Sequence, residues 1–248
     1  YNIVDRIYIG QLPDSRSMMA AIGITAPITL IVTAFTALLG NGGAPLCAIH
    51  LGKKEKEQAE RIMGNSFTAL MAVGLAIILI CLLFGDPLLY AFGARGETLT
   101  HAKSYLYVYI LGTLFVQISV GMNAYITTQG YAKMGMLTVT AGALLNVVLD
   151  PIFIYGFDMG VAGAALATIL SQGVSAAMVL WFLLRGKSEL RLRRKFFRPQ
   201  WNVLRRIMML GVSPFIMKLT ESLLSISFSS SLARYGGDVA VGAMTVIT

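Results

Sequence analysis

The distribution of apolar residues constrains this chain more than any other feature. These residues fall into blocks of roughly 20 or more that short polar segments separate, and a helix of about 20 apolar residues is what a bilayer core requires. Only 13% of the residues are charged and 56% are hydrophobic, whereas soluble domains carry about 25% charged residues. Backbone polar groups in lipid must be satisfied internally. We therefore expect an all-α, polytopic transmembrane bundle.

Breaks in the apolar pattern predict eight spans. The first is partial and ends near Gly10, because about ten residues of helix cover only half of a bilayer core. The next six are predicted at residues 18–49, 62–84, 104–128, 134–155, 161–184 and 203–233, and an eighth begins near Val239. We expect the chain to be a fragment that is cut inside a span at both ends.

The charge pattern predicts three regions. Residues 1–186 form a six-helix bundle whose first helix is truncated, residues 187–202 form a basic cytoplasmic linker, and residues 203–248 begin a second bundle. The linker is richer in charge than any other stretch, which suggests a boundary between bundles.

Basic residues predict the orientation in the membrane, because they concentrate in cytoplasmic loops. Five of the twenty lie at the opposite side and Lys218 lies within a span. The other fourteen lie in or beside the loops that follow the even-numbered spans: Lys53, Lys54, Lys56, Arg61, Lys133, Arg185, Lys187, Arg191, Arg193, Arg194, Lys195, Arg198, Arg205 and Arg206. These loops, and the side from which the first span enters, are therefore expected in the cytoplasm. We expect the basic cluster to meet anionic lipid rather than nucleic acid.

An amide and a carboxylate share one face of the fifth span. Asn146 and Asp150 are four residues apart, and Pro151 leaves the carbonyl of Val147 without its usual donor. Such oxygens suit a hard cation such as Na⁺, and the carboxylate can instead carry a proton. The competing interpretation is hydrogen bonding between helices.

Asp5, in the first span, is expected at a similar depth in the outer half of the membrane. It either faces the bundle interior, where it would share an ion or a proton with Asp150, or pairs with Arg6 at the interface. A charge inside the bilayer costs about 2.5–3.5 kcal/mol, so each one needs a reason.

Further polar groups lie in the sixth and seventh spans. Small residues from Gly160 to Ser171 favour close helix packing, and Thr168 lies one residue off that row with a hydroxyl directed inward. Lys218 and Glu221 are three residues apart, so they form either a structural ion pair or part of a second-bundle cation site.

The fourth span carries aromatic and amide side chains. Tyr109, Gln117 and Asn123 are candidates for binding flat organic cations through cation–π contacts and hydrogen bonds. Tyr105 shares a face with Tyr109, but we favour an interfacial aromatic belt for it.

Residues typical of enzymes are sparse. Cys47 and Cys81 lie in apolar stretches without metal-ligand spacing, which predicts free buried thiols. His50 and His101 lie far apart at span ends. We see no zinc-protease spacing and no nucleophile elbow, so we predict no catalytic site, cofactor or bound metal beyond a coupling ion.

Several segments resemble the multidrug and toxic compound extrusion (MATE) transporters, in the bacterial branch of DinF-like and MepA-like exporters. The similarity covers essentially the whole chain, and the segments that carry it are Tyr1 to Gly10, Gly42 to Leu46 with Leu51-Gly52, Asn146 to Pro151, and Gly160 to Thr168. The resemblance implies twelve helices in two bundles in the cell membrane and a cation site formed by Asp5, Asn146, Asp150 and Thr168. Glu221 resembles an acid of the seventh helix in other branches, although Lys218 departs from that pattern.

The resemblance implies an antiporter that exports organic cations and antibiotics against inward Na⁺ or H⁺ and is monomeric at full length. The alternative is a related flippase of lipid-linked saccharides. We expect such a flippase to have a strongly basic central cavity, and Lys218 is the only clear basic residue within a span here.

Overall fold

The computed structural model describes residues 2–185 and 188–247, and every regular element in these two ranges is a helix. Within these two ranges, five helices are long and apolar enough to cross a membrane, or six if one bent pair counts as a single span. In chain order the elements are α1 (Asn2–Ile9), α2 (Ser15–Gly52), α3 (Lys56–Ala91), α4 (Gly96–Leu111), α5 (Thr113–Val116), η1 (Gln117–Met122), α6 (Asn123–Thr128), α7 (Ala132–Pro151), η2 (Ile152–Gly156), α8 (Gly160–Arg185), η3 (Arg194–Phe196) and α9 (Trp201–Ile247).

These helices confirm the predicted fold class and the order of the spans. The helices are longer than the predicted apolar blocks, because the helical hydrogen bonds continue into the polar residues that flank each block. For example, the block predicted at residues 62–84 lies within α3, which covers 36 residues. The predicted span 104–128 is broken, with a bend of 53° between Gly96–Leu111 and Thr113–Thr128. In α9 the seventh and eighth spans follow one another across Gly237, whose φ of +64° is accessible to glycine at little cost.

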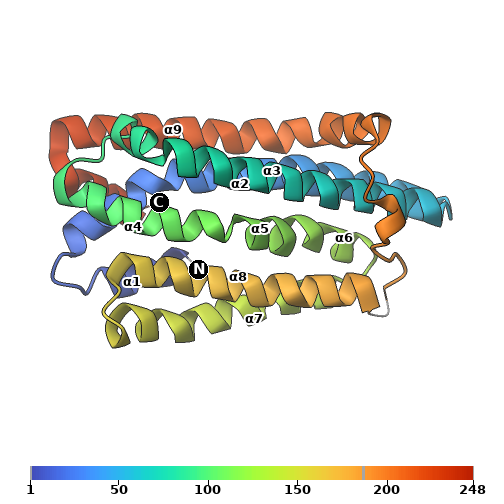
Figure 1. Ribbon diagram of the computed structural model, residues 1–248, viewed down its shortest axis with the longest axis horizontal. Coiled ribbons are helices and arrows are strands. Elements are labelled where there is room, and N and C mark those ends of the chain that lie inside the picture. Colours follow the sequence, from blue (N-terminus) through green and yellow to red (C-terminus); the bar gives the residue numbers. More distant parts are fainter. Residues whose placement is uncertain (1, 186–187, 248) are drawn as a thin grey trace.

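The long helices lie side by side along the long axis of the molecule (Figure 1). α9 follows α2 over most of its length, and α7 pairs with α8 on the other side. The proposed boundary between residues 186 and 187 lies outside the described residues.

The contact between α2 and α9 depends on small residues and on a proline. A Cβ added to Gly211 would meet the carbonyl oxygen of Leu38 at 1.9 Å, so the two backbones approach too closely for any side chain there. Pro27 has no N–H to donate to the carbonyl of Gly23. Ser229 of α9 lies 3.5 Å from that carbonyl oxygen and Ser222 donates to the Pro27 carbonyl at 3.0 Å. α9 therefore places a hydroxyl at the Gly23 carbonyl, which Pro27 leaves without its helical donor, and adds a second contact at the Pro27 carbonyl.

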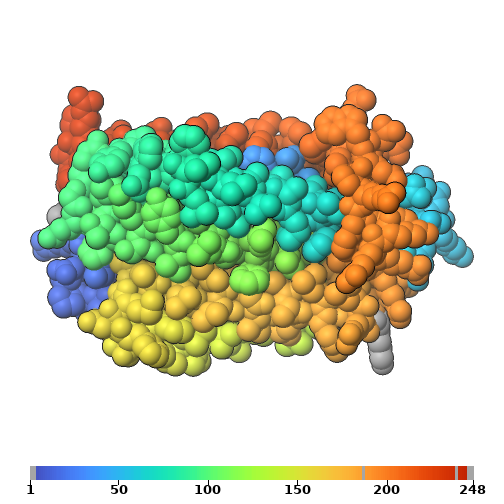
Figure 2. Space-filling model, in the orientation of Figure 1, coloured from blue at the N-terminus to red at the C-terminus, as the bar shows by residue number. Residues whose placement is uncertain are grey.

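The basic segment 188–200 is packed against the bundle. The buried carboxylate of Glu60 accepts from the backbone N–H of Arg191 at 3.1 Å and from Arg193 Nε at 3.1 Å. Asn65 accepts from Gln200 N at 2.6 Å. At the right-hand end of Figure 2 the orange residues of this region lie across the ends of other helices. The predicted linker is thus an ordered strap, which we call the 188–200 strap.

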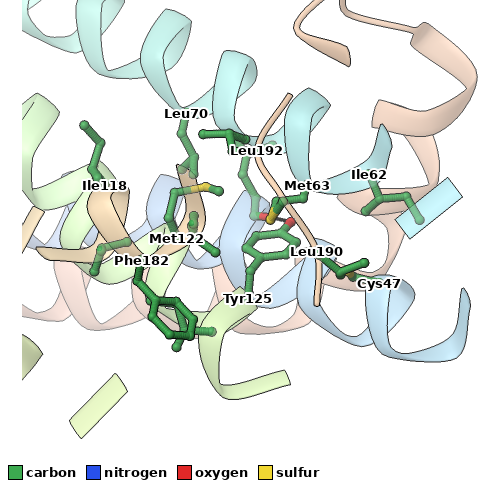
Figure 3. Packing of buried hydrophobic residues seen from close by; sticks show 14 of the residues in the cluster. Cys47, Ile62, Met63, Leu70, Ile118, Met122, Tyr125, Phe182, Leu190 and Leu192 are labelled. Carbon is green, nitrogen blue, oxygen red and sulfur yellow. Dashed lines mark hydrogen bonds between the residues drawn. The ribbon is translucent and has the colours of Figure 1, made fainter. Parts of the chain in front are cut away.

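The strap also closes a hydrophobic cluster at this end of the bundle. Leu190 and Leu192 are buried beside Tyr125 of α6 and Met63 of α3 (Figure 3). Cys47 lies in the same cluster, and both Cys47 and Cys81 are free and buried, as predicted.

Candidate functional site

A cluster of buried polar side chains lies where α1, α7 and α8 meet. Asp5 is 3% exposed and Asp150 and Asn146 are fully buried. Asn146 donates to Asp150 Oδ1 at 2.9 Å, and Thr168 donates to Asp5 Oδ2 at 3.2 Å. The two carboxyl groups are also close enough to interact directly. The structure therefore brings together all four residues for which the sequence predicts a cation site.

Three oxygen atoms in this cluster have no hydrogen-bond partner among the described residues. They are Asp5 Oδ1, Asn146 Oδ1 and Asp150 Oδ2. An unsatisfied buried acceptor costs about 1–3 kcal/mol, and two adjacent carboxylates repel one another when both are charged. Oxygens from carboxylate and amide groups are the ligands that hard cations prefer. The donor set therefore fits a small cation, and it fits a proton shared by the two carboxyls equally well.

The local helix geometry at Asp150 is unusual. α7 ends at Pro151 and continues as the π-helix η2. Proline removes the hydrogen bond to the carbonyl of Val147, and π-helices occur mostly as short insertions, frequently at functional sites. The backbone thus departs from the regular α-helix next to the carboxylate.

Arg6 does not pair with Asp5, against one of the two interpretations of the sequence. Asp5 accepts its hydrogen bond from Thr168, whereas Arg6 lines a pocket between α2 and α9. Tyr105 is 4% exposed, so its assignment to an interfacial belt is wrong. Its ring stacks on that of Tyr109 with centroids 5.8 Å apart, and both phenols lie within electrostatic range of Asp5.

The pocket between α2 and α9 has a volume of about 440 Å³. Glu221 lines it together with Arg6, Thr29, Ser225 and apolar side chains. Lys218 Nζ lies 2.7 Å from Glu221 Oε2, so the predicted ion pair is present. One basic and one acidic side chain face the described part of this pocket, which does not match the strongly basic cavity expected of a flippase.

The structure does not bring the three predicted substrate residues together. Gln117 is fully buried and accepts from Thr36 of α2 at 2.8 Å. Asn123 donates to the Gly135 carbonyl of α7 at 3.1 Å. Tyr109 belongs to the wall beside Asp5, and none of the three lines the pocket between α2 and α9.

The polar face of α8 includes two buried residues, Gln172 and Ser175, that the sequence interpretation missed, although a signal was present. In α8 the residues Thr168, Ser171, Gln172 and Ser175 are spaced by three, one and three positions, which places them on one helix face. All four are buried. Ser171 was assigned only to helix packing, because the surrounding row of small residues obscured this polar face.

Comparison with known proteins gives a consistent result. Residues 1–152 match the family model described as MatE. The multidrug export protein MepA of Staphylococcus aureus strain MRSA252 is 31% identical over 236 residues, which are 95% of this chain and 52% of MepA. The chain thus spans about half the length of the curated relatives it matches.

Solved structures agree with this match. An inward-facing multidrug resistance MATE family transporter of the MOP superfamily superposes with a TM-score of 0.94 at 29% identity, over 99% of this chain and 56% of that one. The MATE multidrug transporter DinF-BH, solved in complex with R6G, gives a TM-score of 0.94 at 32% identity, over 100% of this chain and 55% of that one.

Proposed function

Because the chain belongs to the MATE family, we propose that it forms the cation-coupled part of an antiporter that exports organic cations through the cell membrane. MepA is a multidrug export protein and DinF-BH was solved with R6G, which makes a small organic molecule the natural exported substrate. The observation that carries the proposal is the pair of buried carboxyls, Asp5 and Asp150, with unpartnered oxygens.

Coupling requires that the ion and the substrate favour different states of the protein. Binding of Na⁺ or H⁺ removes the repulsion between the two carboxylates and satisfies the free oxygens of the cluster. That binding favours close packing of α1, which carries Asp5, against α7 and α8, which carry the other three polar side chains of the cluster. Release of the ion restores the repulsion and favours a looser packing of α1, which also carries Arg6 at the pocket between α2 and α9.

The pocket between α2 and α9 is the place where we expect the substrate to bind. Its volume and its mixed lining suit an amphipathic molecule. The carboxylate of Glu221 can bind a cationic group of the substrate, but Lys218 competes with the substrate for this carboxylate.

The first test is transport by the Asp150→Asn variant of the full-length protein in proteoliposomes. Asparagine keeps the size of the side chain but cannot carry the charge or the exchangeable proton. We expect efflux of a fluorescent organic cation to fall by roughly 5- to 150-fold, the range that a coupling free energy of about 1–3 kcal/mol produces.

The matched control is Asp86→Asn, which removes a carboxylate that pairs with Lys103 at 2.6 Å outside the cluster. We expect this variant to export normally. Efflux by Asp150→Asn that equals that of the control would refute the coupling role. Repeating the assay with and without Na⁺ identifies the ion.

A further inference from the structure

We propose that buried polar side chains inside the bundle form a hydrated route for a small monovalent cation, between the Asp5–Asp150 pair and the cytoplasmic side. We call this set the polar seam, and its members are Ser119, Asn123, Thr138, Ser171, Gln172 and Ser175. The proposal rests on the proposed function for the identity of the ion, but hydration of the seam can be tested separately.

One side of the seam is the polar face of α8. Thr168 binds Asp5, and the next turns of the same face present Ser171, Gln172 and Ser175. These residues are 4%, 0%, 9% and 2% exposed in that order. Thr168, Ser171 and Ser175 lie three and four residues apart, so each is about one helical turn from the next, and Gln172 directly follows Ser171. The face therefore leads step by step away from the carboxylates.

The facing side comes from α7 and the π-helix η1. Ser175 donates to the Thr138 carbonyl at 2.9 Å, and Ser119 donates to Gln172. Thr138 and Asn146 are both fully buried and lie eight residues apart on one face of α7. The seam is thus enclosed by three helical segments, one of which is a π-helix of the kind that is frequent at functional sites.

Unpartnered atoms distinguish a hydrated seam from simple packing between helices. Within the described part of the chain, Ser171 Oγ, Asn146 Oδ1 and Asn123 Oδ1 have no hydrogen-bond partner. Hydrogen bonds that served only to join helices would use these atoms. Buried polar groups that lack a protein partner are usually hydrogen-bonded to ordered water. In the hydrocarbon region of a membrane, an unsatisfied polar group costs even more free energy. The three atoms come from α8, α7 and α6, and in the proposed route water molecules or a passing cation satisfy them.

The seam reaches the surface at its far end. Asn123 is only partly buried and donates toward Thr138 Oγ1 at 3.4 Å. One turn further along α6, Thr127 is exposed. This end lies beside the turn at residues 129–131, which the distribution of basic residues predicts to be cytoplasmic. The hydrophobic cluster that contains Tyr125 and Phe182 also packs against Tyr131, so it lies beside this turn.

The test uses Ag⁺, a monovalent cation that reacts with thiols, on the full-length protein in liposomes. All native cysteines are replaced, and single cysteines are introduced as Ser171→Cys, Ser175→Cys or Val174→Cys. Val174 is 42% exposed on the outer surface of the bundle and serves as the lipid-facing control. Ag⁺ is added on the cytoplasmic side, and the remaining thiols are counted with a maleimide after denaturation.

We expect both seam cysteines to react on the order of a hundredfold faster than the Val174→Cys control, because hydrocarbon excludes a small cation. Equal rates at the three positions, or reaction of the seam cysteines only when Ag⁺ is added outside, would overturn the route. The Ser171 hydroxyl has no partner to lose, so the Ser171→Cys variant decides the matter if Ser175→Cys fails to fold. Loss of coupling in Asp150→Asn is measured by export, so either proposal can fail without the other.

Discussion

Individual residues decide how closely the helices of this bundle approach. Gly211 of α9 lies directly against the Leu38 carbonyl of α2, and Gly42 of α2 meets the Ile207 carbonyl of α9 in the same way. Close approach of small residues is the main source of packing energy between membrane helices, because lipid gives little hydrophobic drive. The buried acids are the opposite case, since they weaken the bundle and are retained for another reason.

We expect Gly211→Ala to destabilise the full-length protein by about 1–3 kcal/mol, the usual cost of overpacking, because the new methyl group would lie 1.9 Å from a backbone oxygen. Thermal unfolding in detergent measures this as a lower Tm. The matched control is Gly173→Ala, whose methyl group would lie 3.7 Å from Phe115, an ordinary contact. A Tm for Gly211→Ala equal to that of the control would show that α2 and α9 are not in this contact.

At the scale of elements, the 188–200 strap is held by side chains of neighbouring helices. Three buried or partly buried residues of α3 bind its backbone, and Gln129 accepts from the Leu190 N–H at 2.9 Å. Phe196 packs at the position of Gly64, and the rings of Phe67 and Phe197 lie 5.2 Å apart. The strap therefore ties the start of α9 to α3, so α9 and the first bundle are joined at this end.

We expect Glu60→Ala to increase amide hydrogen exchange in the strap, with the largest change at Arg191. The substitution leaves a part-buried N–H and a half-exposed guanidinium without their acceptor, and about 1–3 kcal/mol, the cost of a fully buried unsatisfied donor, is the upper limit of the effect. Hydrogen-exchange mass spectrometry of the full-length protein measures local opening of this kind. Glu57→Ala is the control, because its exposed pair with Lys195 contributes little to stability. Identical exchange in the two variants would contradict the assigned anchoring role.

At the scale of the whole molecule, the end that carries the strap also carries most of the positive charge. The turn between α2 and α3, the turn before α7 and the strap all lie at this end (Figure 1). The Asp5–Asp150 pair lies toward the opposite end of α7 and α8, near Pro151 and Gly160. If the basic end is cytoplasmic, the carboxyl pair lies in the outer half of the membrane.

We expect the orientation to appear in labelling of single cysteines. In a background free of native cysteines, Lys133→Cys should react with an impermeant maleimide only after the membrane is opened, because basic residues mark the cytoplasmic side. Glu97→Cys, exposed in the first helical turn of α4 at the opposite end, should react in intact cells. The reverse pattern would invert the molecule and place the polar seam's exit outside.

Sequence patterns were sufficient to predict the membrane class and the order of the spans and to single out Asp5, Asn146 and Asp150. The physical reason is that lipid excludes charge and unpaired backbone groups, so apolar blocks must be helices and a charge within them is conspicuous. The helical spacing of Lys218 and Glu221 allowed an ion pair or a cation site, and the structure shows the ion pair.

The pairing of polar groups, in contrast, became apparent from the packing of the helices. The burial of Tyr105, the position of Arg6 at the pocket between α2 and α9 and the anchoring of the strap by Glu60 all depend on contacts between segments far apart in the chain. The polar face of α8 was readable as spacing, but its meaning required Thr138 and Ser119 opposite it. The spacing of residues in the sequence determines on which face of its own helix a residue lies. The packing of the helices determines which other helix contacts that face.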